Sequence, residues 1–156
     1  MTTPGWNEDF QELLDALLDE GVEFVVVGAH AMAMHGVPRA TGDLDVLIRP
    51  SADNAERLMR ALEAFRAPVR AHGIRAEDFC SPGTVYQIGL PPRRIDILTE
   101  ISGVDFDTAY ATRVSSNAPR PVPFLGIEAL LANKRAAARP KDLADVVLLE
   151  AALGGR

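Results

Sequence analysis

The sequence predicts a single α+β domain in which helices flank a β-sheet, and three features of the chain support this. Its 156 residues suit one domain that buries about two-thirds of the surface of the unfolded chain. Several segments carry apolar residues at helical spacing. Between them lie short runs rich in valine and isoleucine, bounded by glycine or proline, as is typical of strands.

Helical periodicity is clearest near the N-terminus. From Phe10 to Leu18, apolar residues recur at i, i+3, i+4, i+7 and i+8, and Gly21 supplies the stop. A second helix is predicted from about residue 52 to 65, with Ser51 or Asp53 as its expected N-cap. The predicted helices cover residues 10–18, 29–35, 52–65 and 127–138, and a last helix starts at Pro140.

The strands are predicted from short runs in which apolar residues are consecutive or alternate with polar ones. The predicted strands are residues 22–27, 43–48, 84–90 and 93–100. Residues 71–82 have weak periodicity and predict only a short helical turn. Residues 101–120 carry Gly103, Pro119 and scattered polar residues, which predict a loop.

Composition excludes several classes of function. The net charge of −6 and the pI near 5.0 argue against non-specific nucleic-acid binding through a broad basic surface. No apolar run approaches the ~20 residues of a membrane span, and the N-terminus lacks the pattern of a secretory signal. Cys80 is the single cysteine and forms no internal disulfide, so we expect a packing role for it and a cytoplasmic protein that does not enter the membrane.

Two carboxylates open the predicted strand 43–48. Asp43 and Asp45 are two residues apart, so a strand projects them from the same face. Like charges at this spacing repel unless a cation lies between them, and Mg²⁺ prefers oxygen ligands of this kind. A solvated turn is the alternative, because the Asp-x-Asp pattern is common in loops.

The turn before these carboxylates favours an anionic ligand. Gly28 follows a strand and precedes a helix of small residues, where free backbone N–H groups attract phosphate. Arg39 and Thr41 can face the same ligand, although Arg39 also suits a solvated turn. His30 can contact phosphate at the helix start, with packing or capping as its alternative role.

Asp96 is the third carboxylate of interest. It lies between Ile95 and Ile97 on a predicted strand, where an acidic side chain is out of place without a partner. The partner is either a bound cation or a basic side chain such as Arg93 or Arg94.

Only two of the sixteen basic residues are lysines, Lys134 and Lys141. Lys134 continues the apolar face of helix 127–138, so it either extends to solvent or meets an anion. Lys141 can form an i, i+4 ion pair with Asp145, which would make it an ordinary surface residue.

Residues 28 to 48 resemble the nucleotidyltransferase superfamily of the DNA polymerase beta type, and in particular its small bacterial branch related to AbiEii-type abortive-infection and toxin–antitoxin nucleotidyltransferases. The shared pattern is a glycine-led turn, a short helix ending near His-Gly, Arg-x-Thr, and Asp-x-Asp on a strand. Asp96 matches the third carboxylate of the superfamily, and residues 133–145 resemble a C-terminal motif of the same branch. One departure is Ala29, where many members have a serine that touches the terminal phosphate.

The resemblance implies a nucleotidyltransferase-type mixed β-sheet flanked by helices, in one domain over residues 1–156. It implies that Asp43, Asp45 and Asp96 hold Mg²⁺ (or Mn²⁺), and that Asp96 accepts the proton of the attacking hydroxyl. The nucleoside triphosphate would be bound by these residues: Gly28, Ala29 through its backbone, His30, Arg39, Thr41, Lys134 and Lys141. The implied acceptor is a hydroxyl of RNA (tRNA included), of a protein or of a small molecule.

The same resemblance implies a toxin with an antitoxin partner, whereas oligomeric state does not follow from it. Two alternatives stay open. The chain can be a degenerate member that keeps the fold as a nucleotide-binding or protein-interaction module, which Ala29 favours. It can also be a metal-dependent phosphohydrolase, which would release inorganic phosphate instead of pyrophosphate.

Overall fold

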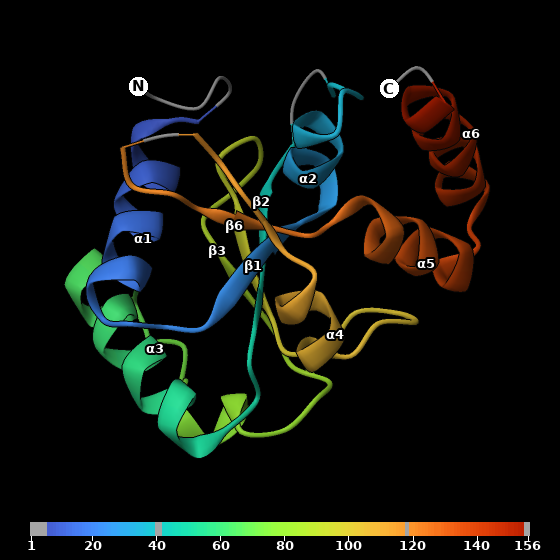
Figure 1. Cartoon of the computed structure of the whole chain (residues 1–156). Coiled ribbons are helices and arrows are strands. Elements are labelled where there is room, and N and C mark those ends of the chain that lie inside the picture. Colours follow the sequence, from blue (N-terminus) through green and yellow to red (C-terminus); the bar gives the residue numbers. More distant parts are fainter. Residues whose placement is uncertain (1–5, 40–41, 118, 155–156) are drawn as a thin grey trace.

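Six short strands form one mixed β-sheet that separates two groups of helices (Figure 1). The computed structural model describes residues 6–39, 42–117 and 119–154. The strand order is β3-β4-β2-β1-β6-β5. The strands are β1 (Phe24–Val27), β2 (Leu44–Ile48), β3 (Val85–Ile88), β4 (Ile95–Leu98), β5 (Val114–Ser115) and β6 (Pro123–Phe124). Strands β2 and β4 are parallel, as are β1 and β6, and the other neighbours are antiparallel.

One face of the sheet packs against α1 (Glu8–Asp19) and α3 (Ala52–Phe65). The predicted stripe of α1 is buried from Phe10 to Leu17, and the predicted bounds of α3 are confirmed. Ser51 caps α3 by accepting a hydrogen bond from the backbone N–H of Asn54 at 3.3 Å. The 3₁₀ turn η1 (Ala76–Phe79) is the short turn predicted within residues 71–82, and it buries Phe79 in the same core.

The opposite face packs against the remaining helices. These are α2 (Gly28–Met34), α4 (Phe106–Ala111), α5 (Ile127–Ala137) and α6 (Pro140–Gly154). Alternation along β1 explains the two cores, because Val25 and Val27 belong to this face whereas Phe24 and Val26 belong to the first. Helix α5 lies beside α6, which ends the chain at the edge of the molecule (Figure 1).

The prediction of a loop over residues 101–120 was wrong. Helix α4 and strand β5 lie in this segment. Asp105 caps α4 by accepting a hydrogen bond from the Thr108 backbone N–H at 2.7 Å. The helix buries its own residues Phe106 and Ala109 against the sheet. A helix of six residues offers too few turns for an apolar stripe to be recognised, and packing on the sheet stabilises it.

Strand β1 begins at Phe24, two residues later than predicted, and Asn54 binds the backbone just before it. This fully buried side chain accepts a hydrogen bond from the Glu23 backbone N–H at 2.7 Å. Its amide group donates to the carbonyl oxygens of Glu23 and Arg49, both at 3.0 Å. The Asn54 side chain therefore links the backbone just before β1 to the backbone just after β2.

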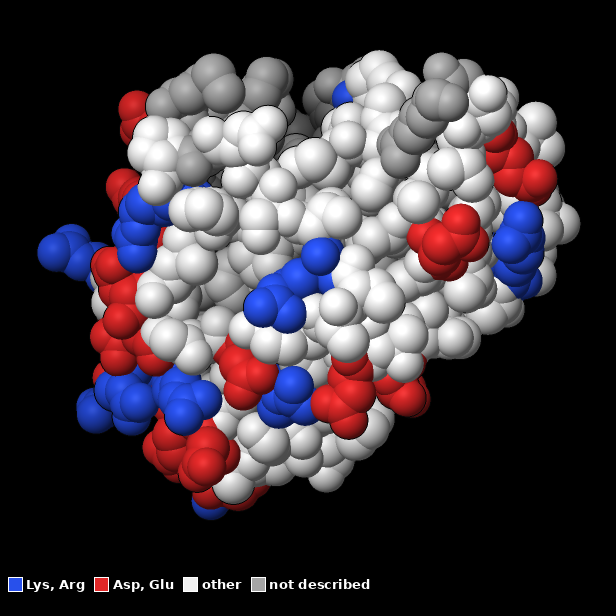
Figure 2. All heavy atoms as spheres, in the orientation of Figure 1, with Lys and Arg blue, Asp and Glu red and all other residues white. Residues whose placement is uncertain are grey.

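The surface agrees with the acidic composition. On the described part of the face in Figure 2, lysine and arginine lie among aspartate and glutamate and form no broad basic patch. Among the helices of the described residues, none is long and apolar enough to cross a membrane.

Candidate active site

The register of two parallel strands brings the predicted carboxylates together. Asp45 of β2 lies directly opposite Asp96 of β4, and Leu44 lies opposite Ile95. Asp43 precedes β2 and shares a face with Asp45 because side chains alternate along a strand. The charges of Asp96 and Asp43 both act on Asp45, so the three carboxylates occupy one side of the sheet.

Arg94 joins this group as a basic partner. Its Nε donates to Asp96 Oδ1 at 3.0 Å, and its Nη2 lies 3.4 Å from Asp96 Oδ2 and 3.0 Å from Asp43 Oδ2. The alternative noted for Asp96, an ion pair with a neighbouring arginine, is therefore present. Within residues 6–39, 42–117 and 119–154, no three His, Cys, Asp or Glu side chains form a ready-made metal site.

Burial and neighbouring carboxylates raise the pKa of Asp45 to about 7. Loss of hydration on burial is the main cause, followed by the charge and hydrogen bond of Asp96 and the charge of Asp43. Arg94 opposes the shift in the pKa of Asp45 without cancelling it. The three carboxylates thus carry more negative charge than Arg94 balances, and Asp45 binds a proton more readily than an exposed aspartate does.

Gly28 is required by its close approach to Asp45. Its φ of +69° is in the left-handed region that favours glycine, and a Cβ placed there would lie 2.3 Å from Asp45 Oδ2. The glycine predicted from the sequence as a phosphate turn therefore also makes room for a carboxylate. It places the first residue of α2 against the acidic group.

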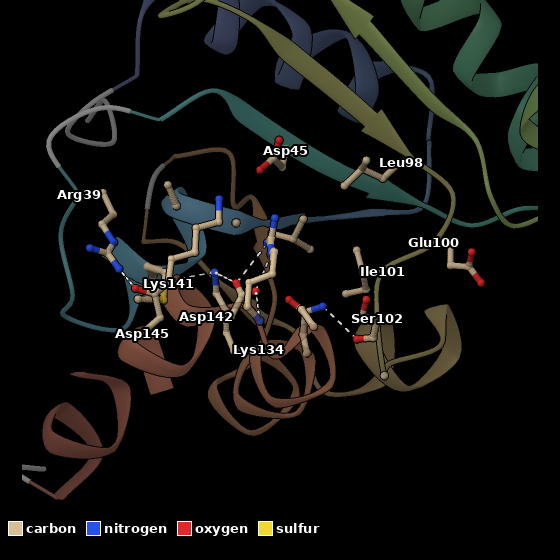
Figure 3. Close-up of a pocket in the computed structure, with 18 residues that line it drawn as sticks. Arg39, Asp45, Leu98, Glu100, Ile101, Ser102, Lys134, Lys141, Asp142 and Asp145 are labelled. Carbon is tan, nitrogen blue, oxygen red and sulfur yellow. Dashed lines mark hydrogen bonds and ion pairs between the residues drawn. The ribbon is translucent and has the colours of Figure 1, made fainter. Parts of the chain in front are cut away.

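A cavity of about 970 Å³ separates the sheet from the end of the chain (Figure 3). Gly28, Ala29 and Asp45 line one side of it. The opposite side is lined by residues of α5, α6 and their connection, including Lys134 and Lys141. Figure 3 shows Asp45 on the strand side and the two lysines on the helix side.

The helix side contains a buried ion-pair network. Asp142 has no exposed surface and Asp145 is 5% exposed. Lys134 Nζ lies 3.0 Å from Asp145 Oδ2 and 3.6 Å from Asp142 Oδ1. Arg139 binds both oxygens of Asp142, through Nε at 2.6 Å and Nη2 at 3.2 Å, and Arg39 pairs with Asp145. We refer to these residues as the helix network.

The helix network decides the roles left open for the two lysines. Lys134 meets anions of its own chain, and burial lowers the pKa of its amine against the opposing effect of Asp142. The pKa of Asp142 is lowered, chiefly by the hydrogen bond from Arg139. The i, i+4 pair of Lys141 with Asp145 is not formed, because Asp145 pairs with Lys134 and Arg39. Lys141 lines the cavity and takes part in no ion pair within the described part of the chain.

His30 lies away from the cavity lining, and its contacts are those of a packing residue. Its ring stacks on Trp6 at 4.9 Å between centroids and meets the edge of Phe10. Its Nε2 is 3.2 Å from the Gly42 carbonyl oxygen, and burial lowers the pKa of the imidazole. Thr41, the other candidate from this stretch, lies outside the described residues.

Several cavity residues were missed from the sequence. Arg139 belongs to the basic segment near Pro140, and its type and position were available signals. Glu100, Ser102 and Asn133 also line the cavity, and the Asn133 amide donates to the Ser102 carbonyl oxygen at 2.9 Å. No sequence pattern marks Glu100 and Ser102, because the fold alone brings residues 98–103 beside α5, whereas Asn133 opens the C-terminal motif noted above.

Comparisons with known proteins give one family and a shared fold. A family model described as "Nucleotidyl transferase AbiEii toxin, Type IV TA system" matches residues 12–154. TM1012 of Thermotoga maritima, a protein assigned as a nucleotidyltransferase, superposes with a TM-score of 0.57 at 17% identity, over 100% of this chain and 97% of that one. ANT(2″)-Ia, solved in complex with adenylyl-2″-tobramycin, gives 0.59 at 15% identity, over 93% and 87%. Among curated proteins, none matches the chain.

Proposed function

Because the chain belongs to the AbiEii family of nucleotidyl transferase toxins of type IV toxin–antitoxin systems, we propose that it moves a nucleoside monophosphate from a nucleoside triphosphate to an acceptor hydroxyl in the cavity described above. One observation carries this proposal: Asp45, which stands in one group with Asp43 and Asp96, lines a cavity whose opposite side carries lysine and arginine. A triphosphate with a bound cation needs carboxylates to hold the cation and basic groups to bind the phosphates, both within the length of the triphosphate.

Asp43, Asp45 and Asp96 would hold the divalent cation, Mg²⁺ or Mn²⁺. Their oxygens are the donors that hard cations prefer. Burial is the main cause of the raised pKa of Asp45, and the charges of Asp96 and Asp43 add to it. A bound cation supplies charge neutralisation at the phosphate oxygens and at the departing pyrophosphate. Asp96 would accept the proton of the attacking hydroxyl, as the superfamily resemblance implies.

The opposite wall would bind the phosphates. Lys141 is the candidate of first choice, since it lines the cavity and its ammonium pairs with no carboxylate in the described ranges. Lys134 and Arg39 pair with Asp145, so we propose that they mainly hold this wall in place and contact the phosphates less directly. At Gly28 and Ala29 only the backbone is available, because Ala29 has no hydroxyl.

The acceptor and partners are proposed from the family. A toxin role implies an antitoxin partner, and the acceptor hydroxyl would belong to RNA, tRNA included, or to a protein. The compound held by ANT(2″)-Ia is an adenylylated small molecule, which keeps a small-molecule acceptor among the candidates. We place the reaction in the cytoplasm, where nucleoside triphosphates are available.

A degenerate module is the second candidate. Ala29 and the Arg94 ion pairs favour it, because a non-catalytic protein can neutralise its carboxylates internally. The two candidates differ in one requirement. An enzyme must transfer the nucleoside monophosphate with a divalent cation bound, whereas a degenerate module transfers nothing, whether it binds a nucleotide or a protein.

The proposal is tested by label transfer. The purified chain is incubated with Mg²⁺, a cell extract and each nucleoside triphosphate labelled at the α-phosphate, and the labelled macromolecule is identified. We expect transfer of the α label and none of a γ label, and a loss of about a thousandfold in Asp45→Asn, because a group that stabilises transition-state charge is removed. Asp53→Asn, an exposed carboxylate of α3, is the matched control and keeps wild-type activity.

Two results would contradict the proposal that the chain is a nucleotidyltransferase. If the wild type labels nothing, the degenerate module is correct; stabilisation by a triphosphate with Mg²⁺ then marks a nucleotide-binding module, and no stabilisation marks a protein-interaction module. If inorganic phosphate is released in place of pyrophosphate, the chain is a phosphohydrolase.

A further inference from the structure

Arg94 completes a four-membered group on one face of the sheet. Leu44 lies opposite Ile95, so Asp43 and Arg94 stand side by side one step before the pair of Asp45 and Asp96. Since side chains alternate along each strand, all four project to the same side. The sequence Arg94-x-Asp96 therefore places a guanidinium against the carboxylates by backbone geometry alone.

The guanidinium uses the oxygens that a metal would need. Its fork engages both oxygens of Asp96, at 3.0 and 3.4 Å, and its Nη2 also reaches Asp43 at 3.0 Å. A divalent cation and a guanidinium cannot share the same lone pairs at these distances.

Arg94 can leave without disturbing the strand. Its side chain is 30% exposed, so water is available to it on one side. The β2–β4 register is held by backbone pairing over four residue pairs. The bond from the Leu44 N–H to the Arg94 carbonyl oxygen, at 3.0 Å, uses the backbone and does not depend on the side chain.

We propose that Arg94 is an internal counter-cation that holds the acidic site closed to metal, and that a divalent cation binds only by displacing it. This inference rests on the proposed metal site. Arg94 is thus a positioning residue: it sets the affinity of the site for the cation and keeps the three carboxylates together when no cation is bound. Each metal-binding event would then require the loss of the Arg94 ion pairs with Asp43 and Asp96.

The test measures Mn²⁺ binding directly, with no nucleotide present. Free Mn²⁺ is followed by electron paramagnetic resonance during titration of the full chain, for the wild type, Arg94→Met, Arg94→Lys and Arg93→Met. We expect Arg94→Met to bind Mn²⁺ at least about tenfold more tightly, because a neighbouring positive charge is removed and the carboxylate oxygens are freed. Arg94→Lys, which keeps the charge but loses the fork, is expected between it and the wild type.

Arg93→Met is the matched control. It removes the same charge one residue away, but Arg93 is 59% exposed and its only carboxylate neighbour within the described residues is Asp9 at 3.8 Å. We expect its Mn²⁺ affinity to stay within about twofold of the wild type, since exposed charges are screened by solvent and salt. A change equal to that of Arg94→Met would overturn the inference, because net charge alone would explain both.

The remaining outcomes separate this inference from the proposed function. Binding that is unchanged or weaker in Arg94→Met shows that Arg94 organises the site for metal, and the inference fails while the metal site stands. Absence of Mn²⁺ binding in every variant overturns the metal site and the inference together. Circular dichroism checks folding, and if Arg94→Met is unfolded, Arg94→Lys carries the test: it must bind more tightly than the wild type.

Discussion

On the sheet side of the cavity three carboxylates share one guanidinium, whereas on the helix side two carboxylates are matched by three cations. The sheet group consists of Asp43, Asp45, Asp96 and Arg94. The helix network consists of Arg39, Lys134, Arg139, Asp142 and Asp145. The sheet group is left with excess negative charge, and the helix network with excess positive charge.

The difference shows what each wall is suited to do. In the helix network the carboxylates are the buried members and every one has a basic partner, so the charges mainly stabilise the α5–α6 pair. In the sheet group the pKa of Asp45 is raised, first by burial and then by the charges of Asp96 and Asp43, which Arg94 does not cancel. Carboxylates that crowd together at a cavity favour binding of a cation, whereas buried carboxylates that each have a basic partner mainly stabilise the fold.

The largest expected effect is on stability in the helix network. Asp142→Asn should lower the free energy of unfolding by about 2–3 kcal/mol, because it leaves Lys134 and Arg139 near a buried neutral side chain and weakens the start of α6. Glu150→Gln is the control, since the exposed pair of Glu150 with Arg135 joins the same two helices. Its loss should stay below about 0.5 kcal/mol. Equal losses in urea unfolding would remove the distinction between the two kinds of pair.

The next effect is the pH dependence of stability without divalent cation. The pKa of Asp45 is raised to about 7 in the folded chain, so between its unfolded value and pH 7 the folded state binds more protons than the unfolded state. Stability from this group is therefore lost as pH rises, by at most about 1.4 kcal/mol per pH unit, and is constant above pH 7.

Comparison with Asp45→Asn isolates this slope. The lowered pKa of His30 contributes the opposite slope in the same pH range, but it is common to both proteins and cancels in the difference. We expect the difference in unfolding free energy between wild type and Asp45→Asn to change from pH 5.5 to pH 7. A difference that is independent of pH would show that Asp45 titrates normally.

The smallest effect distinguishes the two lysines from each other. Lys141→Gln should weaken binding of a non-hydrolysable triphosphate with Mg²⁺ about fivefold, because one point charge near the phosphates is lost, and should leave stability unchanged. Lys134→Gln should reduce stability instead, since Lys134 is a member of the buried network. Arg135→Gln, an exposed cation of α5, is the control for net charge. Calorimetric titration and urea unfolding measure the two quantities.

Local patterns predicted much of the fold and one wall of the site. The period-two spacing of Asp43 and Asp45 and the position of Asp96 between two isoleucines depend on backbone geometry that acts over a few residues. The amphipathic stripe and cap of α3 likewise predicted its bounds. Short elements such as α4 and β6 have no pattern of this length, and they form because the sheet offers them a surface to pack on.

The sequence by itself determined which side chains share a face, because strand and helix periodicity are local properties of the chain. Only the tertiary structure decided which of them become partners: Lys134 meets Asp145 and Asp142, Lys141 meets neither, and Arg94 lies between two carboxylates. The physical reason is that an ion pair depends on distance and burial across elements. Strand register and helix packing set both, and neither is encoded in the spacing of residues along one segment.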